Sequence, residues 1–211
     1  MRVHPWLVLA SVLLLAATSE GAPPEPTTVD DTHRLSITAS APVAVHVYRQ
    51  VDLTADDERI TLDVVRDVFS TASIDVVLTM CGPGMCVTPS GEVLKIRIMR
   101  SASGDEQHSG VLGQALIDSR ARAGVLASVF IDRVQRLARD LGIDDRILLG
   151  RAIAHELGHL LLGTSSHGSG LMREVWSQEE LLGTRRGDWV LDPLDISAIR
   201  DRLTRRGQRD G

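Results

Sequence analysis

Long apolar runs, basic charge and cysteine are all scarce in this 211-residue sequence. The apolar run from Trp6 to Ala17 has about 12 residues, whereas a membrane-spanning helix needs roughly 20. Arg2 precedes the run, and small and polar residues follow it as far as Ala22, which is the pattern of a secretory signal peptide. We therefore predict a signal peptide at residues 1–22, a secreted or periplasmic protein, and no membrane attachment after cleavage.

An excess of positive charge is also absent. Lys and Arg number 23 against 28 Asp and Glu, which gives a formal net charge of -5. Nucleic-acid binding therefore has no support from composition. The basic run between Arg200 and Arg209 suits the last turns of a helix and a solvated tail.

Only two cysteines are present, Cys81 and Cys86, and they bracket the short segment Gly82-Pro83-Gly84-Met85. In an oxidising compartment, such a pair favours a local disulfide. A zinc site is the alternative, but two thiolates alone do not complete a tetrahedral site, and the spacing is not that of a zinc knuckle. We therefore predict a Cys81–Cys86 disulfide.

The segment at residues 23–40 contains Pro23, Pro24 and Pro26 and reads as a flexible leader. No repeat or second linker follows it, so residues 41–211 are expected to form one domain, long enough to bury a core. We expect this domain to be a monomer.

Apolar periodicity and turn residues predict an α+β domain. Short β-branched runs indicate five strands, and residues after Thr54, from Asp132, at Asp144 or Asp145 and at Pro193 indicate helix starts. The expected strands are residues 43–49, 74–80, 93–99, 111–117 and 125–131. The expected helices are one that starts at Thr54, one at residues 132–141, a longer one that is capped by Asp144 or Asp145 and runs to Leu162, and one at residues 193–203. Gly142 and Gly163 are predicted to end the second and third helices.

The third helix carries His155-Glu156-Leu157-Gly158-His159, a His-Glu-x-x-His motif. At 3.6 residues per turn the two histidines share one face, opposite an apolar stripe that includes Ile153 and Leu157. Two imidazoles one turn apart can bind one Zn²⁺, which in a catalytic site needs a third protein ligand and leaves the fourth position to water. Glu156 would then be the general base that takes a proton from that water. The alternative is an amphipathic helix with two surface histidines.

The third ligand has to follow Gly163, which can turn the chain back toward the metal. His167 is the preferred candidate, eight residues after His159. An acid farther along the chain, Glu174, Glu179 or Glu180, is the competing ligand. Glu180 also forms a capping-box pattern with Ser177.

The segment from His155 to Gly163, followed by His167 and by Gly170-Leu171-Met172, resembles the metzincin signature and its Met-turn. In that family the glycine and the third histidine lie three and six residues after the second histidine. Here Gly163 and His167 lie four and eight residues after His159. The resemblance implies a zincin-like fold: a twisted, mixed five-stranded sheet with a backing helix, an active-site helix and a C-terminal helix. It also implies that Met172 lies beneath the metal as an apolar floor, for which an ordinary core methionine is the alternative.

The resemblance further implies a zinc-dependent peptidase that hydrolyses peptide bonds. An edge strand within residues 111–117 would pair with an extended peptide or protein substrate. Because Tyr48 is the only tyrosine and lies far upstream, the metal would provide most of the oxyanion stabilisation. A secreted zinc-containing binding protein with a structural or inactive site is the competing hypothesis.

Overall fold

The structure is a computed structural model that describes residues 42–82, 86, 92–102, 110–183 and 189–207. The predicted signal peptide and flexible leader lie outside these residues. Among the helices that are described, none has the length and apolar character needed to cross a membrane.

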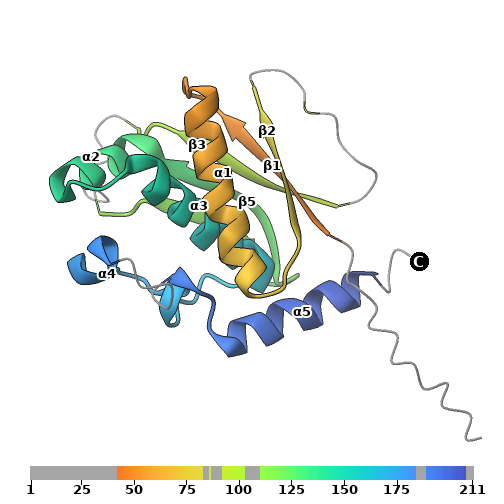
Figure 1. Cartoon of the computed structure of the whole chain (residues 1–211). Coiled ribbons are helices and arrows are strands. Elements are labelled where there is room, and N and C mark those ends of the chain that lie inside the picture. Colours follow the sequence, from red (N-terminus) through yellow and green to blue (C-terminus); the bar gives the residue numbers. More distant parts are fainter. Residues whose placement is uncertain (1–41, 83–85, 87–91, 103–109, 184–188, 208–211) are drawn as a thin grey trace, which may run out of the picture. The chain divides into compact units, whose positions relative to one another are not determined.

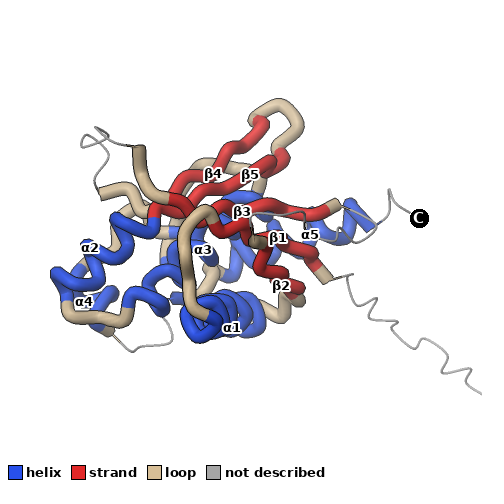
Figure 2. The backbone as a smooth tube through the Cα atoms, turned by 90° about the horizontal axis from the view of Figure 1, so that it is seen from above, coloured by secondary structure: helices blue, strands red, loops and turns tan. Residues whose placement is uncertain are grey.

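A mixed five-stranded sheet forms one layer of the domain, as the sequence predicts. Its strands are β1 (Val43–Arg49), β2 (Val76–Cys81), β3 (Val93–Met99), β4 (Gly113–Asp118) and β5 (Ala123–Phe130). They lie in the order β2-β1-β3-β5-β4, with β4 as an edge strand that pairs antiparallel to β5 while the other pairings are parallel (Figure 2). The predicted edge strand is therefore confirmed.

Helices cover one face of this sheet (Figure 1). They are α1 (Ala55–Thr71), α2 (Ile131–Leu141), α3 (Asp145–Leu162), α4 (Gln178–Leu182) and α5 (Pro193–Gly207), with a 3₁₀ turn at Gly170–Met172. Alternate strand residues such as Val45, Ile96 and Ile98 are fully buried in the core cluster that also holds the apolar residues of α1 and α3. The zincin-like α+β fold expected from the sequence is confirmed.

The ends of the helices follow the predicted capping residues. Thr54 and Asp57 form a capping box at the start of α1, and the Asp144 side chain accepts a hydrogen bond from the Arg146 backbone N–H at the start of α3. Gly142 and Gly163 end α2 and α3 in the left-handed conformation, with φ of 67° and 60°. Local sequence therefore sets where the helix that carries the motif begins and ends.

Helix α3 differs from the prediction in one respect, because it lacks a solvent-facing side along most of its length. From Ala152 to Leu162 every residue is buried, including His155, Glu156 and His159. The helix packs against the sheet, α1, α2, α5 and the 3₁₀ turn, which together surround it. The alternative of two surface histidines is therefore wrong.

Candidate metal centre

His155 and His159 lie one turn apart on α3, and their Nε2 atoms are 3.1 Å apart. The Nδ1 of His155 faces the Leu171 carbonyl oxygen at 2.8 Å, and the Nδ1 of His159 faces the Thr164 carbonyl oxygen at 2.9 Å. A carbonyl only accepts, so each Nδ1 carries the ring proton and donates it. Both Nε2 lone pairs therefore face a shared point that a cation would satisfy.

Two turns supply these carbonyl groups. Gly163 adopts a φ of 60° at the end of α3, and the next residue is Thr164. Gly170 adopts a φ of 55° in the 3₁₀ turn, where the Leu171 backbone N–H donates to the Val190 carbonyl oxygen. The conformational freedom of glycine at these two positions lets the chain present a carbonyl oxygen to each ring.

His167 brings a third imidazole to the same place, at the exposed edge of the site. Its ring centroid lies 4.9 Å from that of His159 and 5.4 Å from that of His155. One ligand nitrogen from each of the three rings lies within 4.8 Å of the others. This arrangement provides three nitrogen donors on one side of a common point.

None of the competing acids joins this group among the described residues. The Glu180 carboxylate accepts a hydrogen bond from the Ser177 backbone N–H at 2.7 Å and pairs with Arg173 at 3.0 Å. Glu180 therefore caps α4, as its spacing from Ser177 predicts. The structure brings His167, rather than an acid, to the two motif histidines.

The three rings fit a zinc ion. Two nitrogen ligands at about 2.0–2.1 Å from a tetrahedral ion lie about 3.3–3.4 Å apart, close to the 3.1 Å between the two Nε2 atoms. Three imidazole ligands leave the fourth position open, which is typical of catalytic rather than structural zinc. The donor set and its geometry therefore suit a catalytic ion.

Burial keeps the two motif histidines neutral. Desolvation lowers the pKa of His155 to about 4, and the nearby His159 and His167 rings act in the same direction. Desolvation also lowers the pKa of His159. Neutral imidazole is the form that binds metals, so both rings are ready to bind near pH 7.

Glu156 lies beside this pair, with only 5% of the residue exposed. Its Oε2 atom has no hydrogen-bond partner, and burial raises the pKa of the carboxyl to about 8. A Cβ atom added at Gly113 on β4 would lie 2.6 Å from Oε1, so the edge strand leaves room for this carboxylate only because residue 113 is glycine. A buried carboxyl without a partner has the character of a functional group.

Met172 is almost fully buried, with 1% of the residue exposed. A Cβ atom at Gly158, on the turn between the two motif histidines, would collide with the Met172 sulfur. The absence of a side chain at residue 158 thus lets Met172 approach α3. This burial fits both an apolar floor beneath the site and an ordinary core methionine, so the floor role stays a prediction.

An open cleft of about 700 Å³ lies over the site. It is lined by Gly110–Ala115 at the start of β4, by Arg133, Arg136, Leu137 and Asp140 of α2, by Ala152, His155, Glu156 and His159 of α3, and by Ser165, His167, Arg173–Trp176 and Leu181. Val111 and Val175 are exposed at 43% and 74%, which puts apolar surface beside the buried polar site. Tyr48 does not line the cleft.

The sequence did not predict several groups that contribute to the site. The Leu171 and Thr164 carbonyl oxygens orient the rings, and Trp176 packs edge-on against His155 with centroids 5.5 Å apart. Gly163 and Gly170 were visible signals for the two turns. Gly113 carried no local signal, because its importance depends on a side chain 43 positions later.

The predicted disulfide is also formed. Cys81 at the end of β2 is bonded to Cys86, with their Cα atoms 5.5 Å apart. This confirms the pairing predicted from the spacing.

No protein-family model matches the sequence, and no curated protein matches it either. The structure is similar to that of archaemetzincin from Methanopyrus kandleri, with a TM-score of 0.50 and 16% sequence identity. The similarity covers 77% of this chain and 96% of the other. It shows that the two chains share a fold, in agreement with the zincin-like fold that the sequence implies.

Proposed function

We propose that this protein is an exported zinc-dependent peptidase that uses His155, His159 and His167 as metal ligands and Glu156 as general base. The convergence of three imidazoles beside an unpartnered buried carboxyl is the observation that carries the proposal. The similarity of fold to archaemetzincin supports zinc-dependent hydrolysis in general.

A zinc ion held by the three rings would supply a polarised water and an electrophile for the substrate carbonyl. The carbonyl groups of Leu171 and Thr164 keep the proton of each motif imidazole on Nδ1, so that Nε2 stays free to bind. Glu156 lies on the same turn, and its unpartnered Oε2 would accept a proton from the attacking water and pass it to the leaving amine.

The edge strand supports an extended peptide or protein as the substrate. Among the described strands β4 pairs only with β5, and its first residues line the cleft. An extended peptide can add to such an edge through main-chain hydrogen bonds, which give affinity without strong sequence preference. The exposed Val111 and Val175 would contact apolar substrate side chains.

Export is part of the proposal. The signal-peptide pattern at residues 1–22 supports it, and the Cys81–Cys86 disulfide suits an oxidising compartment. The test is to recover the chain from outside the cytoplasm and to measure its mass. The mass should correspond to a chain that lacks about the first 22 residues.

The decisive functional experiment compares purified wild-type protein with Glu156→Gln on an unfolded protein substrate, with and without a chelator. We expect chelator-sensitive cleavage by the wild type, and at least a 100-fold loss in Glu156→Gln with zinc still bound. Glu174→Gln is the matched control, since Glu174 also lines the cleft but lies outside the metal group. Unchanged turnover in Glu156→Gln would refute the assigned base. Zinc without hydrolysis in the wild type would favour the competing zinc-binding protein.

A further inference from the structure

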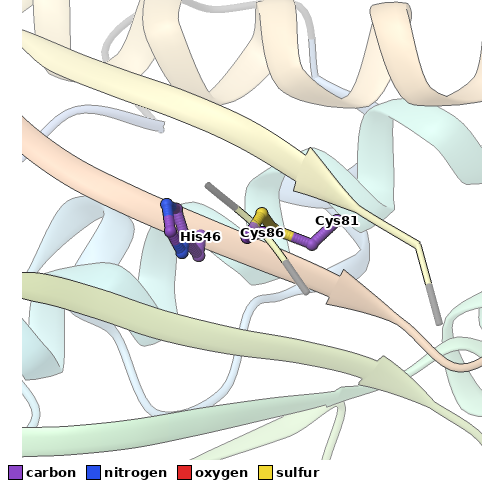
Figure 3. A group of neighbouring side chains, drawn as sticks. All are labelled: His46, Cys81 and Cys86. Carbon is purple, nitrogen blue, oxygen red and sulfur yellow. A yellow bond between two sulfur atoms is a disulfide. The ribbon is translucent and has the colours of Figure 1, made fainter. Parts of the chain in front are cut away.

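His46, Cys81 and Cys86 form a second group of metal-ligating side chains (Figure 3), and none of the three lines the cleft. His46 lies on β1 between Val45 and Val47, which are both fully buried in the core beneath the helices. Because successive strand residues point to opposite faces, the His46 side chain points to the face of the sheet opposite the helices. One ligand atom from each of the three residues lies within 4.8 Å of the others.

Two neighbouring strands hold two of these ligands in place. In the parallel pairing of β1 with β2, His46 lies opposite Thr79 and Tyr48 lies opposite Cys81. Cys81 is two residues beyond Thr79, so its side chain shares a sheet face with that of His46. Cys86 reaches the same place from beyond the end of β2 through its bond to Cys81. Only the third ligand therefore depends on a segment outside the sheet.

Two of the three ligands are shielded from solvent. His46 and Cys81 are buried, with 2% and 3% of each residue exposed. Few waters therefore reach these two ligands, so an ion bound there would be held mainly by protein side chains.

Tyr48 adds a contact to the imidazole itself. Its hydroxyl oxygen lies 3.4 Å from Nδ1 of His46, and the two rings meet edge-on. Polar contacts of this kind orient imidazole ligands in metal sites. Tyr48, the only tyrosine in the sequence, does not line the cleft. Its side chain is directed at His46 instead.

We propose that reduction of the Cys81–Cys86 disulfide converts this group into a binding site for one Cu(I) ion. Thiolate and imidazole ligands select soft or borderline ions, chiefly Cu(I) and Zn²⁺. The group supplies two sulfurs and one nitrogen, so Zn²⁺ would still need a fourth ligand such as water, at a place where His46 and Cys81 are buried. A three-coordinate monovalent ion is satisfied by that set.

The conversion requires a dithiol reductant. The S–S bond takes up two electrons and two protons from the dithiol, which itself becomes a disulfide, and leaves two thiols. Binding of Cu(I) between the sulfurs then releases the thiol protons to solvent. In the oxidised protein both sulfurs are used in the S–S bond, so the same group binds no copper.

The test uses the mature zinc-loaded protein, so that the three-histidine site is already filled. One sample keeps its disulfide, and the other is reduced with dithiothreitol and desalted without oxygen. Both are titrated with Cu(I) in competition with a bathocuproine chelator. We expect one additional Cu(I) per chain in the reduced sample and none in the oxidised one. The copper-edge X-ray absorption spectrum should show two sulfur neighbours and one nitrogen neighbour.

Variants separate this site from adventitious thiol binding. In the reduced state His46→Asn should lower Cu(I) affinity at least tenfold, whereas Thr79→Ala, beside His46 on the same face, should leave it unchanged. Retention of one zinc at the three-histidine site checks folding, and Cys86→Ser replaces His46→Asn if that variant loses its zinc. The proposal is overturned if reduced wild type takes up no Cu(I), prefers Zn²⁺ there, or binds copper equally well without His46.

Discussion

The Glu156 carboxyl combines burial, a raised pKa of about 8 and an Oε2 atom without a hydrogen-bond partner. In the metal-free protein it therefore keeps its proton at neutral pH. An unfolded chain would release that proton near the ordinary value of 4.5. The folded state thus binds more protons than the unfolded state between these two values, and stability falls as pH rises through that range.

Glu156→Gln should remove this pH dependence, because glutamine does not titrate. In metal-free protein we expect the variant to gain stability relative to wild type by about 1.4 kcal/mol per pH unit between about pH 5 and 8. His155, whose lowered pKa acts in the opposite sense, is present in both proteins and cancels from the difference. Urea unfolding at four pH values measures the gap; a gap that stays constant with pH would contradict the assignment.

Gly113 should be as important to activity as a residue that touches the substrate. In Gly113→Ala the new methyl group would lie 2.6 Å from Glu156 Oε1, so the carboxylate has to move. We expect hydrolysis to fall at least tenfold with zinc retained, because misplaced catalytic groups lose rate steeply. Gly110→Ala is the control, since its added Cβ meets nothing within 4 Å although Gly110 also lines the cleft. Equal activity in the two variants would show that β4 does not position Glu156.

At the scale of elements, the two helix ends at Gly142 and Gly163 make a matched pair. Both glycines have left-handed backbone conformations, with φ of 67° and 60°. A Cβ at Gly142 meets nothing, whereas one at Gly163 would collide with the Arg122 carbonyl oxygen. Gly163 also precedes Thr164, whose carbonyl oxygen orients the His159 ring.

Gly142→Ala should therefore destabilise the protein by about 1 kcal/mol, the ordinary penalty for a left-handed alanine. We expect a larger loss for Gly163→Ala, and a fall in zinc affinity that Gly142→Ala does not share. Thermal unfolding and zinc competition on both variants measure the two effects. Equal zinc affinities would mean that the end of α3 does not set the orientation of His159.

The elements themselves were largely predictable from local sequence. Strands follow β-branched runs, and helix boundaries follow capping residues such as Thr54, Asp144 and Gly163, because these signals act over a few residues. The burial of α3 on all sides was not predictable. Periodicity within one helix reveals its apolar stripe, but it does not reveal that β4, α2 and the 3₁₀ turn pack around the histidine-bearing side and leave it at the bottom of a cleft.

At the scale of the whole molecule, the fold decides between ligands that the sequence left open. His167 and the three acids all follow Gly163, and spacing alone did not separate them. The turn that fixes the Leu171 carbonyl depends on a hydrogen bond to Val190. The contacts of Glu180 with Ser177 and Arg173 hold its carboxylate outside the histidine group. Such long-range contacts, like the approach of Gly113 to Glu156, are set by packing rather than by local pattern.

The three-histidine site is most directly tested by zinc content, measured by elemental analysis, together with the zinc-edge X-ray absorption spectrum of wild type, His167→Ala and Glu174→Ala. We predict one zinc per chain in wild type, with three nitrogen neighbours at about 2.0–2.1 Å and one further light-atom neighbour. His167→Ala should lose one nitrogen neighbour and bind zinc more weakly by at least tenfold, while Glu174→Ala should match wild type. A wild-type site with fewer than three nitrogens, or a loss of zinc on removing Glu174 instead of His167, would contradict the account.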